Sequence, residues 1–408
     1  MLTMNKNKIL YAGRRAEDIR SDCWIAFEPK DSGGLVIQLK SRVEPMYGNS
    51  IHNQCKEVLT GLKIEHARLE IEDYGALPFT IAARIETAVR RAGFNPPEYL
   101  PEMKPHCIYP TKRDRFRRSR LYLPGDQPKF FINAGLHKPD GVILDLEDSV
   151  APTEKDAAAL IVRNALRQVN FYDAERMVRI NQGELGLQDL EWIIPHNVHI
   201  VLIPKVEKPE QVIEVDDKIK DILKKNAIKQ PVYIMPIIES AMGGLQAYEI
   251  AVASPNTVAL ALGLEDYTAD IGTQRTLDGR ESFWLRSVIV NAARAAGIQP
   301  IDSVFSDVSD MDGLRESVIE AKSLGFDGKG CIHPRQITII HQAFAPGEKE
   351  TAKAMKIVLA FEEAEKKGLG VVSLGSKMID PPVVKRALKT VEMAETLELI
   401  PGNWRENK

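Results

Sequence analysis

The chain has 408 residues, a formal net charge of −3, and apolar and charged fractions of 44% and 27% that are ordinary for a globular protein. This length allows two or three domains, and the nearly balanced charge gives no support for a nucleic-acid partner or an anionic membrane surface. No apolar run approaches the ~18 residues of a membrane span, and the first residues lack a signal-peptide pattern. The four cysteines show no CxxC spacing, so we expect reduced thiols in a cytoplasmic protein, without zinc or disulfides.

The first hundred residues carry both strand-like and helix-like patterns. The predicted strands are GLVIQLKSRV and ARLEIEDYG, and helical spacing is found in EPMYGNSIHNQCKEVLTGLKI and LPFTIAARIETAVRRAG. We therefore predict a small N-terminal α/β domain over residues 1–105. A proline-rich stretch, FNPPEYLPEMKPHCIYP, ends it, because proline blocks regular structure and stiffens a linker.

Residues 112–345 show eight strand patterns that alternate with helical stretches. This count over about 230 residues is typical of an α/β protein with a (β/α)₈ TIM barrel. An open doubly wound sheet is the alternative. It would be expected to carry a glycine-rich phosphate loop, and neither GxGxxG nor GxxxxGK[ST] occurs. A C-terminal helical extension is predicted over 346–408. The predicted strands read SRLYLPG, GVILDLED, RMVRIN, VHIVLIPK, VYIMPIIES, TVALALGLED, IDSVFSD and FDGKGCIHP.

Charged and polar side chains follow several of these strands. The catalytic groups of a barrel lie at the carboxyl ends of its strands, so we expect these side chains to face one pocket. The acids are Asp145, Glu147, Asp148, Glu239, Glu265 and Asp266, and the other strand ends carry Arg179, Asn181, Lys205, Asp307 and His333.

Carboxylates that converge on one pocket repel one another, so they need a cation or raised pKa values. Oxygen ligands without a histidine or cysteine cluster favour Mg²⁺ or Mn²⁺ over zinc. Glu239 and Asp266 are the predicted ligands because each ends a long apolar strand, and Arg179 could hold a substrate carboxylate. This pattern indicates metal-assisted carbon–carbon bond chemistry on a 2-oxo acid. Structural or helix-capping acids are the alternative.

Residues from about 118 to 398 resemble the citrate lyase β-subunit-like aldolases, within the larger HpcH/HpaI aldolase family. The resemblance implies a (β/α)₈ barrel, a homotrimer or a multiple of it, and Mg²⁺. The implied reaction cleaves a 3-hydroxyacyl thioester into a 2-oxo acid and an acetyl thioester. The matching segments are RSRLYLPG, LDLEDSVAPTEKDAA, VRIN, LIPKVE, IIES, GLEDYTADIGTQRT, AARAAGIQPIDSVFSD, GFDGKGCIHPRQI and GLGVVSLGSKMIDPPVV.

The same resemblance implies a role for each matching residue. Glu239 and Asp266 would hold the metal, and Arg179 would bind the carboxylate of the oxo acid and polarise its carbonyl. Four other residues would assist: Glu147 and Asp148 would order metal-bound water, Arg118 would help to hold the substrate or the developing enolate, and Lys155 would steady the acid cluster.

The segment SDVSDMDG, residues 306–313, resembles the SDxDG-type sequences of malyl-CoA and citramalyl-CoA lyases. In those relatives the segment reaches a neighbouring subunit's site and supplies an acid–base aspartate. Asp310 is therefore the predicted proton-transfer residue, with capping of the following helix as the alternative. We interpret His333 as a hydrogen-bonded structural residue and Cys331 as a small core residue.

The first hundred residues resemble the citrate lyase γ subunit, a small acyl carrier protein. That carrier depends on a serine that bears a phosphoribosyl-dephospho-CoA arm, and Arg20 stands at the serine position here, next to Ser21. In an extended segment, adjacent side chains point to opposite faces, so Ser21 is expected to point the wrong way. We therefore expect no covalent arm and a retained role in packing or oligomerisation. The basic run KRDRFRRSR, residues 112–120, is a solvated linker or a contact for CoA phosphates.

Three functions follow from these observations. The leading one is a Mg²⁺-dependent lyase for a citramalyl-, malyl- or citryl-CoA thioester, with an acyl-CoA and a 2-oxo acid as its small-molecule partners. The second keeps this chemistry but acts on a carrier-bound substrate inside a citrate lyase complex. The third is a non-catalytic structural or regulatory protein that binds acyl-CoA.

Overall fold

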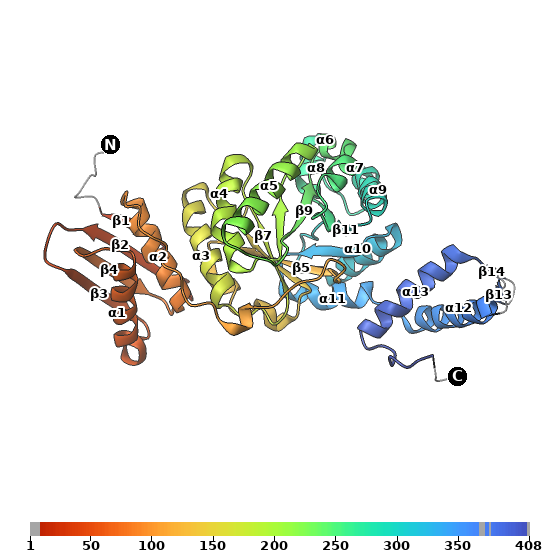
Figure 1. The fold of residues 1–408 in the computed structure, drawn as a ribbon, viewed down its shortest axis with the longest axis horizontal. Helices are drawn as coiled ribbons and strands as arrows, with labels where there is room; N and C mark the ends of the chain where they lie inside the picture. Colours follow the sequence, from red (N-terminus) through yellow and green to blue (C-terminus); the bar gives the residue numbers. More distant parts are fainter. Residues whose placement is uncertain (1–8, 367–371, 375–376, 406–408) are drawn as a thin grey trace. The chain divides into compact units, whose positions relative to one another are not determined.

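The structure is a computed structural model that describes residues 9–366, 372–374 and 377–405. The chain forms two compact units, one of Met1–Asp310 with Glu320–Ile337 and the other of Met311–Ile319 with Thr338–Lys408. Within the described ranges, no helix combines the length and the apolar character that crossing a membrane requires. Figure 1 shows the order of the elements along the chain.

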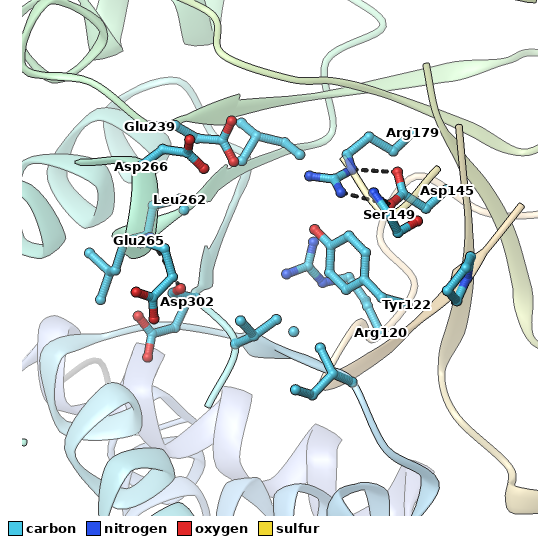
Figure 2. Close-up of a pocket in the computed structure, with 18 residues that line it drawn as sticks. Arg120, Tyr122, Asp145, Ser149, Arg179, Glu239, Leu262, Glu265, Asp266 and Asp302 are labelled. Atoms are coloured by element: carbon cyan, nitrogen blue, oxygen red, sulfur yellow. Dashed lines mark hydrogen bonds and ion pairs between the residues drawn. The ribbon is translucent and has the colours of Figure 1, made fainter. Parts of the chain in front are cut away.

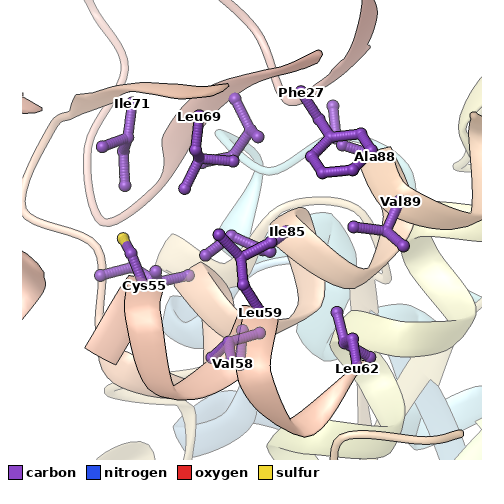
Figure 3. Close-up of a cluster of buried hydrophobic side chains, with 14 of the residues drawn as sticks. Phe27, Cys55, Val58, Leu59, Leu62, Leu69, Ile71, Ile85, Ala88 and Val89 are labelled. Carbon is purple, nitrogen blue, oxygen red and sulfur yellow. The ribbon is translucent and has the colours of Figure 1, made fainter. Parts of the chain in front are cut away.

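The N-terminal part is a four-stranded mixed sheet with the order β1-β2-β4-β3, and two helices cover it. β1 and β2 pair antiparallel, as do β2 and β4, whereas β3 and β4 are parallel. Leu69 and Ile71 of the sheet pack against Val58 and Leu59 of α1 and Ile85 of α2 (Figure 3). The elements are β1 (Leu10–Ala12), β2 (Cys23–Pro29), β3 (Leu35–Ser41), α1 (Glu44–Gly61), β4 (Ala67–Asp73) and α2 (Pro78–Arg91). Two of these strands, β1 and β2, had no predicted counterpart.

The predicted (β/α)₈ barrel is confirmed. Eight parallel strands in the described part of the chain close in the order β10-β11-β12-β5-β6-β7-β8-β9. Most of their residues are buried, as expected for parallel strands that have helices outside and packed side chains inside. The strands are β5 (Ser119–Pro124), β6 (Gly141–Asp145), β7 (Glu175–Arg179), β8 (Ile200–Ile203), β9 (Tyr233–Ile238), β10 (Ala259–Leu262), β11 (Gln299–Asp302) and β12 (Gly328–Cys331).

Helices follow the barrel strands and surround them (Figure 1). A layer of apolar side chains fills the barrel interior, including Ile143, Met177, Leu202, Met235 and Ile301. The barrel is therefore filled at this layer, and a cavity can form only toward the ends of the strands. The helices are α3 (Lys155–Gln168), α4 (Gly183–Ile193), α5 (Pro209–Lys225), α6 (Ala241–Leu245), α7 (Ala247–Val252), α8 (Leu264–Asp270), α9 (Arg280–Ala295), α10 (Met311–Leu324) and α11 (Pro334–Phe344).

Helix α2 joins the N-terminal sheet to the barrel, because it packs against α3 as well as α1. All its residues from Phe79 to Val89 are buried. Glu86 of α2 and Arg163 of α3 form an ion pair of 2.6 Å in which both side chains are fully buried. Arg84 of the same helix is bonded to Asp22, just before β2, and to the backbone carbonyl of Asp126, in the loop after β5.

The C-terminal unit contains two long helices with a core of their own. Ala354 and Val358 of α12 (Glu348–Lys366) pack with Val384 and Val391 of α13 (Pro381–Thr396) and with Trp404. Between the helices lies an antiparallel pair, β13 (Val372–Leu374) and β14 (Lys377–Ile379). The domain boundaries read from the sequence remain predictions.

Candidate functional site

A cavity of about 300 Å³ opens at the carboxyl ends of the barrel strands (Figure 2). Strands β5, β6, β7, β9, β10, β11 and β12 and the loops after them supply its walls. Five of the predicted strand-end residues line it, namely Asp145, Arg179, Glu239, Glu265 and Asp266. The expectation that these side chains share one pocket therefore holds for this group.

Arg179 is the last residue of β7, and two carboxylates hold its guanidinium. Its Nε and Nη2 atoms donate to the two carboxylate oxygens of Asp145 at 2.6 and 2.7 Å, and its Nη1 lies 3.1 Å from Glu147. Burial disfavours the charged form of Asp145, but the bonds from Arg179 outweigh it and lower the pKa of Asp145. A guanidinium has five donors, so Arg179 keeps two N–H groups for a ligand.

Glu239 follows β9 and is buried. Burial raises the pKa of its carboxyl to about 7; Asp266 adds to this rise, and Arg179 opposes it. The backbone N–H of Lys205 donates to the Glu239 carboxylate at 3.1 Å. Gly263 leaves the room for this carboxylate, because a Cβ at that position would lie 2.3 Å from Oε1 of Glu239.

Asp266 lies in the first turn of α8 and not at a strand end, because β10 already stops at Leu262. Its side chain is 46% exposed. The ammonium of Lys205 lies between three carboxylates, at 3.4 Å from Glu147, 3.2 Å from Asp148 and 3.5 Å from Asp266. Partial burial disfavours its charge, but these carboxylates outweigh the effect and raise the pKa of Lys205. The sequence analysis placed Lys205 at the carboxyl ends of the strands but assigned it no function.

The donor set of the cavity fits a hard divalent cation. The described residues contain no group of three or more His, Cys, Asp or Glu side chains arranged to hold a metal. Glu239 and Asp266 nevertheless line one cavity, and Mg²⁺ is commonly held by one or two carboxylates plus water and substrate. Burial, the main cause of the raised pKa of Glu239, disfavours its charged form, and Asp266 adds to this effect. A bound cation would favour that charged form.

Other predicted site residues lie outside this cavity. Arg118 precedes β5 at the amino end of the barrel, and it forms an ion pair of 2.8 Å with Asp140. The structure therefore does not bring Arg118 to the cavity, and Arg120, two residues along the strand, lines it instead. Lys155 donates from Nζ to the carbonyl oxygens of Leu146 and Glu147, so it supports the backbone of the acidic loop and not its carboxylates.

Asp310 lies just before α10 and is not among the residues that line the cavity. Its backbone N–H donates to Asp307 at 3.3 Å. His333 is also outside the lining, and its Nδ1 accepts from the N–H of Arg335 at 3.1 Å. Sequence reasoning missed five polar lining residues, Arg120, Tyr122, Ser149, Asp302 and Ser303. For the first two, the alternation of β5 was an available signal, because residues 120, 122 and 124 share its inner face.

The loop before β2 contains the position expected to bear an acyl-carrier arm. Arg20 is exposed, and Ser21 is half-buried with a left-handed φ of 57°. The N–H of Ser21 donates to the carbonyl of Tyr74 at 3.0 Å. The segment is therefore not extended at Ser21, and the alternation of adjacent side chains does not apply there.

Comparisons with known proteins identify two regions. The family described as HpcH/HpaI aldolase/citrate lyase matches residues 118–334. An acyl-carrier family, described as malonate decarboxylase delta subunit (MdcD), matches residues 20–92. The predicted resemblance to an acyl carrier is confirmed at this level.

Among curated relatives, the citrate lyase subunit beta of Haemophilus influenzae is 40% identical over 285 residues, which cover 69% of this chain and 98% of that protein. The mitochondrial citramalyl-CoA lyase of Mus musculus is 33% identical and covers 73% of this chain and 95% of that protein. Protein CitE from Mycobacterium tuberculosis, solved with magnesium, acetoacetate and coenzyme A, is 32% identical with a TM-score of 0.58. That match covers 69% of this chain and 99% of the solved one.

Proposed function

Because the chain belongs to the HpcH/HpaI aldolase/citrate lyase family, we propose that it is a Mg²⁺-dependent carbon–carbon lyase. Its substrate would be a 3-hydroxyacyl-CoA thioester, which it cleaves into a 2-oxo acid and an acetyl thioester. The observation that carries this proposal is the placement of Glu239, Asp266 and Arg179 around one cavity. The magnesium and coenzyme A bound to the CitE protein support it.

Three residues that line the cavity, and Glu147 beside them, have roles in this proposal. Glu239 and Asp266 hold the metal, which when bound stabilises negative charge on the substrate oxygens. Arg179 directs its remaining N–H groups to the carboxylate of the oxo-acid half. Glu147 is fixed by Arg179 and by a 3.0 Å hydrogen bond from Gln182, so it can orient water beside the metal.

The carbon–carbon bond breaks as the substrate hydroxyl loses its proton and becomes the carbonyl of the 2-oxo acid. The acetyl carbon keeps the electron pair as an enolate and then takes up a proton. Asp310 is assigned to this proton transfer. Since it does not line the cavity of its own chain, we assign it to the site of a neighbouring subunit in a homotrimer.

The metal assignment is tested with Glu239→Gln and Asp266→Asn. Each removes one of two carboxylate ligands, so Mg²⁺-dependent release of a 2-oxo acid from hydroxyacyl-CoA should fall to background. Asp217→Asn is the matched control, because Asp217 is an exposed carboxylate of α5 that forms an ion pair with Lys220 on the same helix. Full activity of the wild-type protein in EDTA would overturn the metal dependence.

The match to an acyl-carrier family favours a second candidate, cleavage of a carrier-bound thioester. We favour free acyl-CoA because Arg20 replaces the serine that an arm requires. Intact-protein mass spectrometry of chain from its own host should show no phosphoribosyl-dephospho-CoA mass. An added mass that Ser21→Ala removes would assign the enzyme to the carrier-bound class.

A further inference from the structure

The loop after β8 holds Lys205 against the end of β9 through its main chain. The N–H of Lys205 donates to the carboxylate of Glu239, and the N–H of the next residue, Val206, donates to the carbonyl of Ile237, both at 3.1 Å. Neither hydrogen bond uses the lysine side chain. The position of the loop and the charge of its side chain can therefore be separated by mutation.

The ammonium of Lys205 lies among carboxylates that include a proposed metal ligand. Its Nζ is 3.2 Å from Asp148, 3.4 Å from Glu147 and 3.5 Å from Asp266. Asp266 lines the cavity together with Glu239, the second proposed ligand (Figure 2). The side chain of Lys205 is 31% exposed, so water screens its charge only in part. The ammonium thus already supplies positive charge at the place where a metal would supply it.

Other cations at this edge of the barrel hold other carboxylates. Arg179 is bonded through two atoms to Asp145, and Arg275 forms an ion pair of 2.7 Å with Glu265. Within the described part of the chain, Lys205 is the cation that forms an ion pair with Asp266. Its charge is therefore the one that a metal bound to Asp266 would meet first.

A metal ion and this ammonium compete for the same oxygen atoms. Mg²⁺ lies about 2.1 Å from its oxygen ligands, so a Mg²⁺ on Oδ1 of Asp266 would be within about 5.6 Å of Nζ of Lys205 as it now lies. Positive charges at such a separation repel each other strongly in a partly buried site. The lysine stem is flexible and partly exposed, so the ammonium can turn away, but it then loses its contacts with the carboxylates.

We propose that Lys205 is a resident counter-ion of the metal site, which stabilises the carboxylates when the metal is absent and lowers their affinity for Mg²⁺. Metal binding then displaces the ammonium from Asp266, and the ion is held loosely enough to exchange. This inference rests on the proposed function, because it takes Glu239 and Asp266 as the metal ligands, and it adds a residue that sets the affinity of their site.

The test is calorimetric titration of the full-length protein with Mg²⁺. Lys205→Met removes the charge but keeps the backbone N–H and a side chain of similar length, so it should bind Mg²⁺ about 10- to 100-fold more tightly than the wild-type protein. Lys205→Arg keeps the charge and should stay within about threefold of the wild type. Lys220→Met is the matched control, because Lys220 forms its ion pairs on α5 with Asp216 and Asp217, and its Mg²⁺ affinity should not change.

Thermal melts provide a second readout. Without Mg²⁺, Lys205→Met should melt at a lower temperature than the wild-type protein, because three carboxylates lose a shared counter-ion. Saturating Mg²⁺ should raise the Tm of this variant by more than that of the wild type, since tighter binding stabilises the folded state more. A lysine that only supported its loop would, when replaced, lower both the Tm and the affinity for Mg²⁺.

Unchanged or weaker Mg²⁺ binding by Lys205→Met would overturn the inference. The proposed function fails in a different way, through the absence of Mg²⁺ binding by both the wild-type protein and Lys205→Met. If Lys205→Met does not fold, Lys205→Gln replaces it, because its amide removes the charge and still donates to the carboxylates. It should tighten Mg²⁺ binding in the same direction, and a failure to do so would equally overturn the inference.

Discussion

At the scale of single residues, the acidic edge of the barrel is organised by one lysine. Lys205 has a left-handed φ of 52°, an unfavourable conformation for a residue with a side chain. This conformation accompanies two contacts, because its N–H donates to Glu239 and its ammonium faces Glu147, Asp148 and Asp266. The lysine thus limits repulsion among carboxylates that the proposed metal would otherwise have to offset alone.

Gly263 sets the position of the Glu239 carboxylate. Gly263→Ala would place a Cβ 2.3 Å from Oε1 of Glu239, while the backbone φ of −118° is acceptable for alanine. We expect the protein to remain folded and to bind Mg²⁺ about 10- to 100-fold more weakly, as when a group that orients a metal ligand is lost.

Calorimetric titration with Mg²⁺ and a thermal melt measure the effect of Gly263→Ala. Gly347→Ala serves as the control, because a Cβ at Gly347 meets no atom within 4 Å. Unchanged Mg²⁺ affinity in Gly263→Ala would contradict the assignment of Glu239 as a ligand.

The buried His199 makes the free energy of unfolding of the protein depend on pH. Burial lowers the pKa of His199 to about 3, and the charge of Arg176 adds to this effect. Its Nδ1 accepts from the N–H of Arg176 at 3.1 Å and its Nε2 lies 2.8 Å from the carbonyl of Tyr109, so the neutral ring satisfies both contacts. The unfolded chain binds a proton below about pH 6.5, whereas the folded protein does not, so stability is lost as the pH falls from 6.5 toward 3.

Between these two pH values, the free energy of unfolding should fall by up to about 1.4 kcal/mol for each pH unit, because one proton is bound on unfolding. Urea unfolding of the wild-type protein and of His199→Gln between pH 7 and pH 4.5 measures it. His196 has a similarly lowered pKa of about 3, so the variant should keep part of the acid sensitivity and lose the rest. Parallel curves for the two proteins would contradict the argument.

At the scale of elements, α2 belongs to two cores. One face packs against α1 and the N-terminal sheet, and the other packs against α3 of the barrel. The buried pair Glu86–Arg163 crosses the second contact, and Arg90 also donates to Glu86 at 2.8 Å. A freely swinging carrier domain would lack such a contact, so the packing agrees with the expected retained role of this part of the chain.

Glu86→Ala leaves the fully buried Arg163 without its main partner, so we expect the free energy of unfolding to fall by about 3–5 kcal/mol. Glu98→Ala is the matched control, because it removes the other carboxylate of Arg163, which is 42% exposed, and should cost about 1 kcal/mol or less. Urea unfolding followed by tryptophan fluorescence measures both. Similar losses in the two variants would show that burial does not strengthen the pair.

The sequence predicted most elements of the barrel, because buried parallel strands read as short apolar runs bounded by polar residues. It placed Glu239 and Arg179 at the cavity for the same reason. It misplaced Asp266, because a strand pattern cannot show that β10 stops four residues earlier and that α8 begins at once. The resemblance assigned substrate binding to Arg118, but β5 begins only at Ser119. Arg120, inside the strand, is the arginine that faces the cavity. The environment of Lys205 combines residues from four separate segments of the chain and has no local signal in the sequence.

At the scale of the whole molecule, the proposed site is complete only in an assembly. Asp310→Asn chains and Asp266→Ala chains should each be inactive, for the lack of a proton-transfer residue and of a metal ligand. Mixed under conditions of subunit exchange, they should recover partial activity, because some sites then combine an intact Asp310 with an intact Asp266. Activity assays and native mass spectrometry of the mixture check this expectation, and exchange without recovery would place Asp310 outside the neighbouring site.

The ion pair Glu86–Arg163 also bears on how the chain folds during its synthesis. The two residues are 77 positions apart, so at about 5–20 residues per second the ribosome adds Arg163 some 4–15 s after Glu86. The N-terminal sheet, α1 and one face of α2 can form a core in that interval, whereas the other face of α2 remains uncovered. The nascent β5, β6 and α3 then emerge beside a preformed surface that fits α3. We therefore expect the N-terminal domain to act as a template on which the first part of the barrel assembles.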